Sequence, residues 1–173
     1  MSHLNKKTYK DYKQLIPYIN GFLTTLEILN EDVNRGQNYY IEEIERYDNY
    51  QESIKKHLSQ PNYIITLEEK TDWKMELEQT SIYFFESILN KIELVNRENG
   101  SSLVDNIIKR KETNFNFINE EYISLMSELM IDKSKFFEVF VNWNNGSFYE
   151  CYHKDYLIDN NKGLFFIHFG TSD

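Results

Sequence analysis

The sequence predicts an α+β fold in which an N-terminal helical bundle of three long and two short helices precedes a three-stranded antiparallel β-meander. Apolar residues recur every three or four positions through most of the N-terminal part, which is the spacing of helices with one buried face. After Ser134 the apolar period shortens to two, as in half-buried strands, and Asn145-Gly146 is typical of a tight hairpin turn. We expect one domain over residues 1–173, with the helical part at about 14–132 and the meander at about 135–170.

Proline, glycine and capping residues divide the helical part. Pro17 suits the first turn of a helix, because the N–H that proline lacks would be unpaired there, and Gly36 separates this helix from the next. The second helix carries Tyr47 on its buried stripe. Thr66 and Glu69 have the spacing of a capping box at the start of the third helix. The predicted helices cover residues 17–34, about 39–59, 66–98, 103–111 and 120–130.

The three predicted strands are rich in aromatic and β-branched residues. A two-residue loop at Asn145-Gly146 would place Glu138 opposite His153, and a short second loop would place His153 opposite His168. These three polar residues would then form a row across the sheet. The predicted strands are 135–143, 147–158 and 164–170, and the row is flanked by Cys151 and Asp155.

This row is a candidate chemical site. Carboxylate, imidazole and thiolate groups can bind zinc, and a cysteine beside a histidine can become a nucleophile. Polar residues on one face of an antiparallel sheet are also what exposure to solvent predicts, and we prefer that interpretation. The sequence has no phosphate-binding glycine loop, nucleophile elbow, paired-cysteine motif or zinc-protease motif, so we expect no catalytic residue, no metal and no cofactor. The residues kept as candidates for a metal- or cysteine-dependent enzyme are Glu138, Cys151, His153 and His168.

The predicted register also gathers aromatic residues beside the histidines. An aromatic patch mixed with charged residues on an exposed face is typical of a recognition surface. Alternatively, the last helix or an N-terminal segment covers the patch. The patch consists of Phe136, Phe140, Tyr149 and Phe166, and the opposite face, the predicted core, carries Phe137, Val139, Val141, Trp143, Phe148, Tyr152, Ile158, Phe165, Ile167 and Phe169.

The formal net charge is −9, which argues against direct binding to nucleic acid, since phosphates are neutralised by a basic surface. The charge is uneven, because residues 27–48 hold seven acidic residues against two arginines. Such a stretch either keeps a protein soluble or engages a basic partner, for example a nucleic-acid-acting enzyme whose phosphate groove it would occupy. On the outer side of the second predicted helix, the leading candidates for partner contacts are Glu42, Glu45 and Glu52.

Composition narrows the cellular context. The chain has no alanine and many Asn, Ile, Lys and Tyr residues, a bias that indicates AT-rich coding in a bacterial or phage genome. A single cysteine excludes an internal disulfide. No apolar run is long enough for a signal peptide or a membrane span, so we expect a cytoplasmic protein.

We therefore expect a non-enzymatic protein that binds another protein. The leading hypothesis is an acidic inhibitor of the toxin-immunity or phage anti-defence type, which rests on analogy in size, charge and missing catalytic motifs. Two alternatives stay open: a small enzyme that uses the sheet face, and a structural homodimer joined through its long helices.

Overall fold

The computed structural model describes residues 12–30, 36–96, 116–143, 149 and 151–172, with only the backbone at 86–96 and 143. These residues form four helices and a five-stranded antiparallel sheet with the strand order β1-β5-β4-β3-β2. Among the described helices, none is long and apolar enough to cross a membrane. The elements are α1 (Tyr12–Asn30), β1 (Gly36–Glu43), α2 (Tyr50–His57), β2 (Tyr63–Glu69), α3 (Trp73–Asn96), a helix over 116–129, β3 (Lys135–Trp143), β4 (Tyr152–Asp159) and β5 (Leu164–Ser172).

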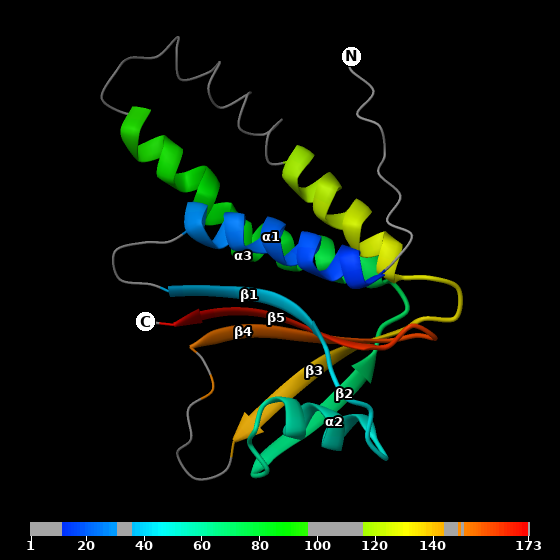
Figure 1. The fold of residues 1–173 in the computed structure, drawn as a ribbon. Coiled ribbons are helices and arrows are strands. Elements are labelled where there is room, and N and C mark those ends of the chain that lie inside the picture. Colours follow the sequence, from blue (N-terminus) through cyan, green and yellow to red (C-terminus); the bar gives the residue numbers. More distant parts are fainter. Residues whose placement is uncertain (1–11, 31–35, 97–115, 144–148, 150, 173) are drawn as a thin grey trace.

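Helices lie on both faces of the sheet (Figure 1). α1, α3 and the helix over 116–129 pack on one face, which we call the helix side, and α2 packs on the other face, the α2 side. The larger core lies on the helix side and includes the fully buried Leu23, Phe85 and Met126. The smaller core packs Ile54 of α2 against strands β2 to β5, including Phe166. Because both faces are covered, a strand such as β5 is buried along most of its length.

The predicted helical bundle is wrong, because two of its segments are strands. Tyr39 and Ile41 of β1 are buried and alternate with more exposed neighbours. In β2, Tyr63 and Ile65 are buried while Ile64 between them is exposed. In segments this short, the spacing of the apolar residues fits both a strand and one face of a helix. Pairing with β5 and β3 makes these segments strands.

The remaining helices differ from the prediction at their boundaries. α3 begins at Trp73, and Oδ1 of Asp72 caps it by accepting a hydrogen bond from the Met75 N–H at 3.1 Å. Thr66 and Glu69, the predicted capping box, instead lie in β2. The predicted helix over 103–111 lies outside the described residues, and the one over 120–130 is part of the helix over 116–129.

The three C-terminal strands are antiparallel neighbours, but both predicted registers are wrong. Glu138 pairs with Tyr156, three residues beyond the expected His153. His168 pairs with Asp155, two residues beyond His153. A shift by an odd number of residues moves side chains to the other face of a sheet, whereas an even shift keeps them on the same face. The turn that sets the first register lies outside the described residues.

Candidate functional site

The structure separates the predicted row of polar residues. Glu138 lies on the helix side, whereas His168 and its partner Asp155 lie on the α2 side. His153 lies two residues before Asp155 on β4 and therefore on the same face of the sheet. Cys151 is exposed and directly precedes this strand. Within the described part of the chain, no group of three or more His, Cys, Asp or Glu residues could hold a metal ion. The four candidates for an enzymatic site therefore do not converge.

Glu138 is a buried carboxylate, 5% exposed, between two lysines. Its Oε2 lies 2.9 Å from Nζ of Lys70, and Nζ of Lys154 donates to its Oε1. Burial would raise the pKa of Glu138, but the hydrogen bonds from Lys154 and Lys70 outweigh burial and lower it. Nζ of Lys70 also lies 3.0 Å from Oε1 of Glu68. The hydrogen bonds of Lys70 to Glu138 and Glu68 raise the pKa of Lys70. This arrangement is an ion-pair network that joins neighbouring strands, and an ionised Glu138 has no proton to donate as a general acid.

Asp155 and His168 form a second buried polar pair, which the predicted register missed. Oδ1 of Asp155 lies 2.6 Å from Nδ1 of His168, and the two side chains are 0% and 2% exposed. The Tyr40 ring lies 5.0 Å from the imidazole, and the Tyr149 hydroxyl lies 3.2 Å from Nδ1. A carboxylate orients the general base of many hydrolases in this way. Here the imidazole is covered by protein while Cys151 is exposed, so the pair links β4 to β5 without presenting a base to solvent.

The four aromatic residues of the predicted patch lie in different environments. Phe136 is buried on the helix side, and Phe166 is buried on the α2 side. Tyr149 is half-buried, and its ring lies 5.7 Å from that of His168. Phe140 is the exposed member of the four, at 39%. The structure therefore does not bring these residues together on one surface.

A cleft of about 330 Å³ opens on the helix side, between α3 and β4. The rings of Tyr83 and Tyr152 lie in its wall and are more than half exposed. Glu76, Gln79 and Lys154 add one negative, one neutral and one positive group to the same wall. This mixture of charges does not indicate a particular class of ligand. The cleft is an exposed, partly aromatic surface and not a defined binding pocket.

The three acidic candidates all lie at the surface, but on three elements instead of one helix. Glu42 ends β1 together with Glu43, Glu45 lies in the connection to α2, and Glu52 lies on α2. Each is exposed, as is Asp48. We call residues 42–52 the acidic segment, because it holds these five acidic residues against a single arginine.

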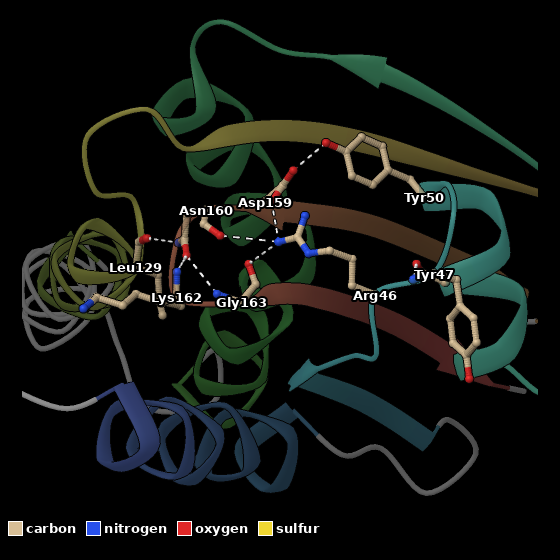
Figure 2. Close-up of polar contacts among 9 residues, drawn as sticks. Arg46, Tyr47, Tyr50, Leu129, Asp159, Asn160, Lys162 and Gly163 are labelled. Carbon is tan, nitrogen blue, oxygen red and sulfur yellow. Dashed lines mark hydrogen bonds and ion pairs between the residues drawn. The ribbon is translucent and has the colours of Figure 1, made fainter.

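Arg46 fastens the middle of the acidic segment to the turn between β4 and β5 (Figure 2). Its Nη2 lies 2.7 Å from Oδ1 of Asp159, and 3.4 and 3.5 Å from the carbonyl oxygens of Asn160 and Gly163. The hydroxyl of Tyr50, on α2, donates to the other oxygen of Asp159. Burial would raise the pKa of Asp159, but the hydrogen bonds from Arg46 and Tyr50 lower it. The carboxylate therefore stays charged and binds two side chains of the segment.

The turn that receives Arg46 is itself fixed by Asn160 (Figure 2). Oδ1 of Asn160 accepts hydrogen bonds from the N–H groups of Lys162 at 2.8 Å and Gly163 at 3.2 Å. Its Nδ2 donates to the carbonyl oxygen of Leu129 at 2.8 Å, so the turn is also tied to the helix over 116–129. Arg46 thus binds a turn that is itself hydrogen-bonded internally and to the helix over 116–129.

A second set of bonds fixes the acidic segment to α2. The Tyr47 N–H donates to Oγ of Ser53 at 2.9 Å, and Oδ1 of Asn49 caps α2 by accepting from the Glu52 N–H at 2.8 Å. The Tyr47 ring points away from the contacts of Arg46 (Figure 2), is 40% exposed, and donates its hydroxyl to Oε2 of Glu45 at 2.7 Å. This hydrogen bond raises the pKa of Tyr47, so its phenol stays neutral.

The sequence pattern of residues 39–59 predicts one helix instead of β1 and α2, so Arg46 is not predicted as a site residue and Tyr47 is wrongly predicted to be buried. Asn49 followed three residues later by Glu52 is typical of a helix start. This spacing indicates that a new helix begins at α2. The resulting surface has exposed carboxylates and a tyrosine on a segment that Arg46 ties to the turn between β4 and β5 and that Ser53 ties to α2. Comparison of the chain with family models, with curated proteins and with solved structures finds no match in any of the three.

Proposed function

We propose that this chain is a non-enzymatic inhibitor that binds a basic partner protein through the acidic segment, residues 42–52. The observation that carries the proposal is the rigid attachment of an exposed, acidic surface. Arg46 ties the segment to Asp159, and Ser53 holds the backbone of Tyr47. A segment that is already ordered loses little conformational entropy on binding, so more of the contact energy becomes affinity.

The chemistry of the segment fits lysine and arginine side chains. Carboxylates such as Glu42 and Glu45 attract a basic surface over the Debye length, which speeds association. Tyr47 offers a large, rigid ring with a polar tip, and tyrosine is among the residues that most often dominate binding energy at interfaces. A phosphate-binding groove of a nucleic-acid-acting enzyme has the complementary charge, and filling it with carboxylates would block that enzyme.

The enzymatic alternative has less support from the geometry. It rests on a shared site for Glu138, Cys151, His153 and His168, and Glu138 lies on the opposite face from His168. Glu138 is ion-paired with Lys70, and the buried His168 is in hydrogen-bond contact with the buried Asp155. The homodimer alternative gains no specific contact from the described helices, whose buried faces pack on the sheet.

The test is a kinetic measurement on a partner recovered from the native host with the immobilised chain. The Glu42→Lys/Glu45→Lys double variant should lower the association rate roughly tenfold at low salt, and added salt should remove most of that difference. Tyr47→Ala should mainly raise the dissociation rate, because it removes a short-range contact. Both variants should keep the wild-type melting temperature within a few degrees, since the changed side chains are exposed.

The matched control is Glu78→Lys/Glu120→Lys, which changes net charge by the same amount on exposed positions of the helix-side helices. This control should affect association far less than the change in the acidic segment. A partner whose binding is indifferent to salt, to the Glu42/Glu45 reversal and to Tyr47→Ala would refute the proposal.

A further inference from the structure

The two edge strands of the sheet differ in how their outer backbone groups are satisfied. At β1, side chains of α1 cover the edge. Nδ2 of Asn20 donates to the carbonyl oxygen of Ile41 at 2.9 Å, and Oδ1 of Asn20 accepts from the Ile41 N–H at 2.8 Å. Oε1 of Glu27 accepts from the Tyr39 N–H. These contacts occupy both backbone groups of Ile41 and the N–H of Tyr39, in the middle of the edge where another strand would bind.

β2 forms the opposite edge, and the described residues leave its outward backbone groups unpaired from Ile65 to Glu69, whereas the Tyr63 N–H donates to the carbonyl oxygen of Gln60 at 3.3 Å. The Lys70 N–H donates to the carbonyl oxygen of Phe136 at 2.9 Å, in the same register as the β2–β3 ladder. In an antiparallel pair, alternate residues direct both backbone groups to the same neighbour, so Ile65, Leu67 and Glu69 direct theirs outward. Within the described residues, the N–H and C=O groups of these three have no hydrogen-bond partner.

The side chains of β2 define what could pair with this edge. At one end, Ile64 is 46% exposed on a part of the helix side that the helices leave uncovered, and Ile65 lies on the α2-side core. At the other end, Glu68 and Glu69 are exposed. The edge is therefore apolar at its N-terminal end and acidic at its C-terminal end.

We propose that β2 binds an extended segment of another protein, which adds to the sheet as an antiparallel sixth strand. Cross-strand neighbours should be complementary, so the segment carries two basic residues opposite Glu69 and Glu68 and apolar residues opposite Ile65 and Ile64. Because the added strand runs in the opposite direction, its order from the N-terminus is basic, basic, two β-formers, apolar, apolar. Backbone bonds supply affinity, and charge sets direction and register.

A second copy of the chain fits this edge less well. In an antiparallel pairing of two β2 strands centred on Leu67, Glu69 of each copy would lie opposite Ile65 of the other. A carboxylate would then lose water against an apolar side chain at both ends. The net charge of −9 on each chain adds repulsion.

The test uses the capped peptide Lys-Arg-Val-Thr-Val-Ile, labelled with a fluorophore, and the full chain. In the peptide, the first, third and fifth residues would direct their N–H groups to β2, and the second, fourth and sixth residues would direct theirs away from it. N-methylation of the third residue should weaken binding by at least about tenfold, whereas N-methylation of the fourth should change it by no more than about twofold. On binding, amide exchange should slow at Leu67 and Glu69 but not at Ile41, whose N–H already binds Asn20.

A matched pair of protein variants tests the same contact from the other side. Glu69→Pro removes an outward N–H without breaking a bond to β3, whereas Glu69→Ala removes the same carboxylate but keeps the N–H. We expect Glu69→Pro to bind the peptide more weakly than Glu69→Ala, with both variants folded. Glu42→Lys/Glu45→Lys should leave peptide binding unchanged, because this surface does not depend on the acidic segment.

Three results would overturn the proposal. One is absence of binding at millimolar peptide, and another is equal loss of affinity with either N-methylated peptide. The third is a dimer of the chain that Glu69→Pro dissociates while the peptide fails to bind, which would assign the edge to a second copy.

Discussion

His57, on α2, is an imidazole held between an aromatic core and an exposed carboxylate. Its ring lies 5.0 Å from that of Phe166 and 6.3 Å from that of Tyr40. Burial lowers the pKa of His57 below its ordinary value, and the attraction of Glu42, whose Oε2 lies 3.7 Å from Nδ1, offsets only part of this effect. His168 lowers the pKa further, and Asp155 raises it. The folded protein therefore holds His57 neutral at a pH where the unfolded chain already binds a proton.

This linkage predicts a loss of stability in mild acid. The contribution of His57 is fully present above the ordinary pKa of 6.5, and it is lost as the pH falls through 6.5 towards the lower folded value. His57→Phe keeps a ring against Phe166 and removes the titrating group. Urea unfolding at about pH 7 and pH 5 should show a smaller drop in the free energy of unfolding for the variant than for the wild type. An equal drop in both proteins would show that His57 does not carry the effect.

Other single residues show which features of a site can be predicted. Glu138, Asp155 and His168 are all nearly fully buried, although polar residues on a sheet are usually solvated. They are buried because helices cover both faces and because each has a charged or hydrogen-bonding partner. The sequence shows that such residues are present in the strands. Their partners depend on register, which a shift of one residue changes.

At the scale of elements, the strongest local patterns were predicted and the ambiguous ones were not. β3 to β5 are dense in aromatic and β-branched residues, which made their period of two clear. β1 and β2 are short, and each ends in two glutamates, which suit a helix as well as a strand edge. What makes them strands is pairing with β5 and β3, and those partners lie far along the chain.

The cover over the β1 edge leads to a prediction for α1. Asn20→Ala would leave the N–H and C=O of Ile41 without their side-chain partner and should lower the free energy of unfolding by about 1–3 kcal/mol. It should also promote self-association, because the exposed edge can pair with another copy. Urea unfolding and light scattering over a range of concentrations measure both effects. Thr24→Ala, at an exposed position of the same helix, is the control and should show neither.

At the scale of the whole molecule, the ends of the chain depend on each other. The first strand, β1, pairs along its length with the last strand, β5. The larger core joins α1, α3 and the helix over 116–129 to side chains of β3, β4 and β5, including Phe136, Tyr156 and Phe169. The apolar face of each helix can be found in the sequence. The surface that it covers comes from the other end of the chain, which no local pattern shows.

This dependence distinguishes the observed fold from a self-contained helical bundle. A fragment of residues 1–132 would keep the helical segments, β1 and β2 but would lose β3, β4 and β5. If the helices formed their own core, the fragment would unfold cooperatively by itself. Because their apolar faces pack on the missing strands, we expect the fragment to show reduced helix content and no cooperative thermal transition. Circular dichroism of the fragment beside the full chain makes the comparison, and co-expression of residues 133–173 should restore the transition. A sharp transition in the fragment alone would mean that the helices are stable without the sheet.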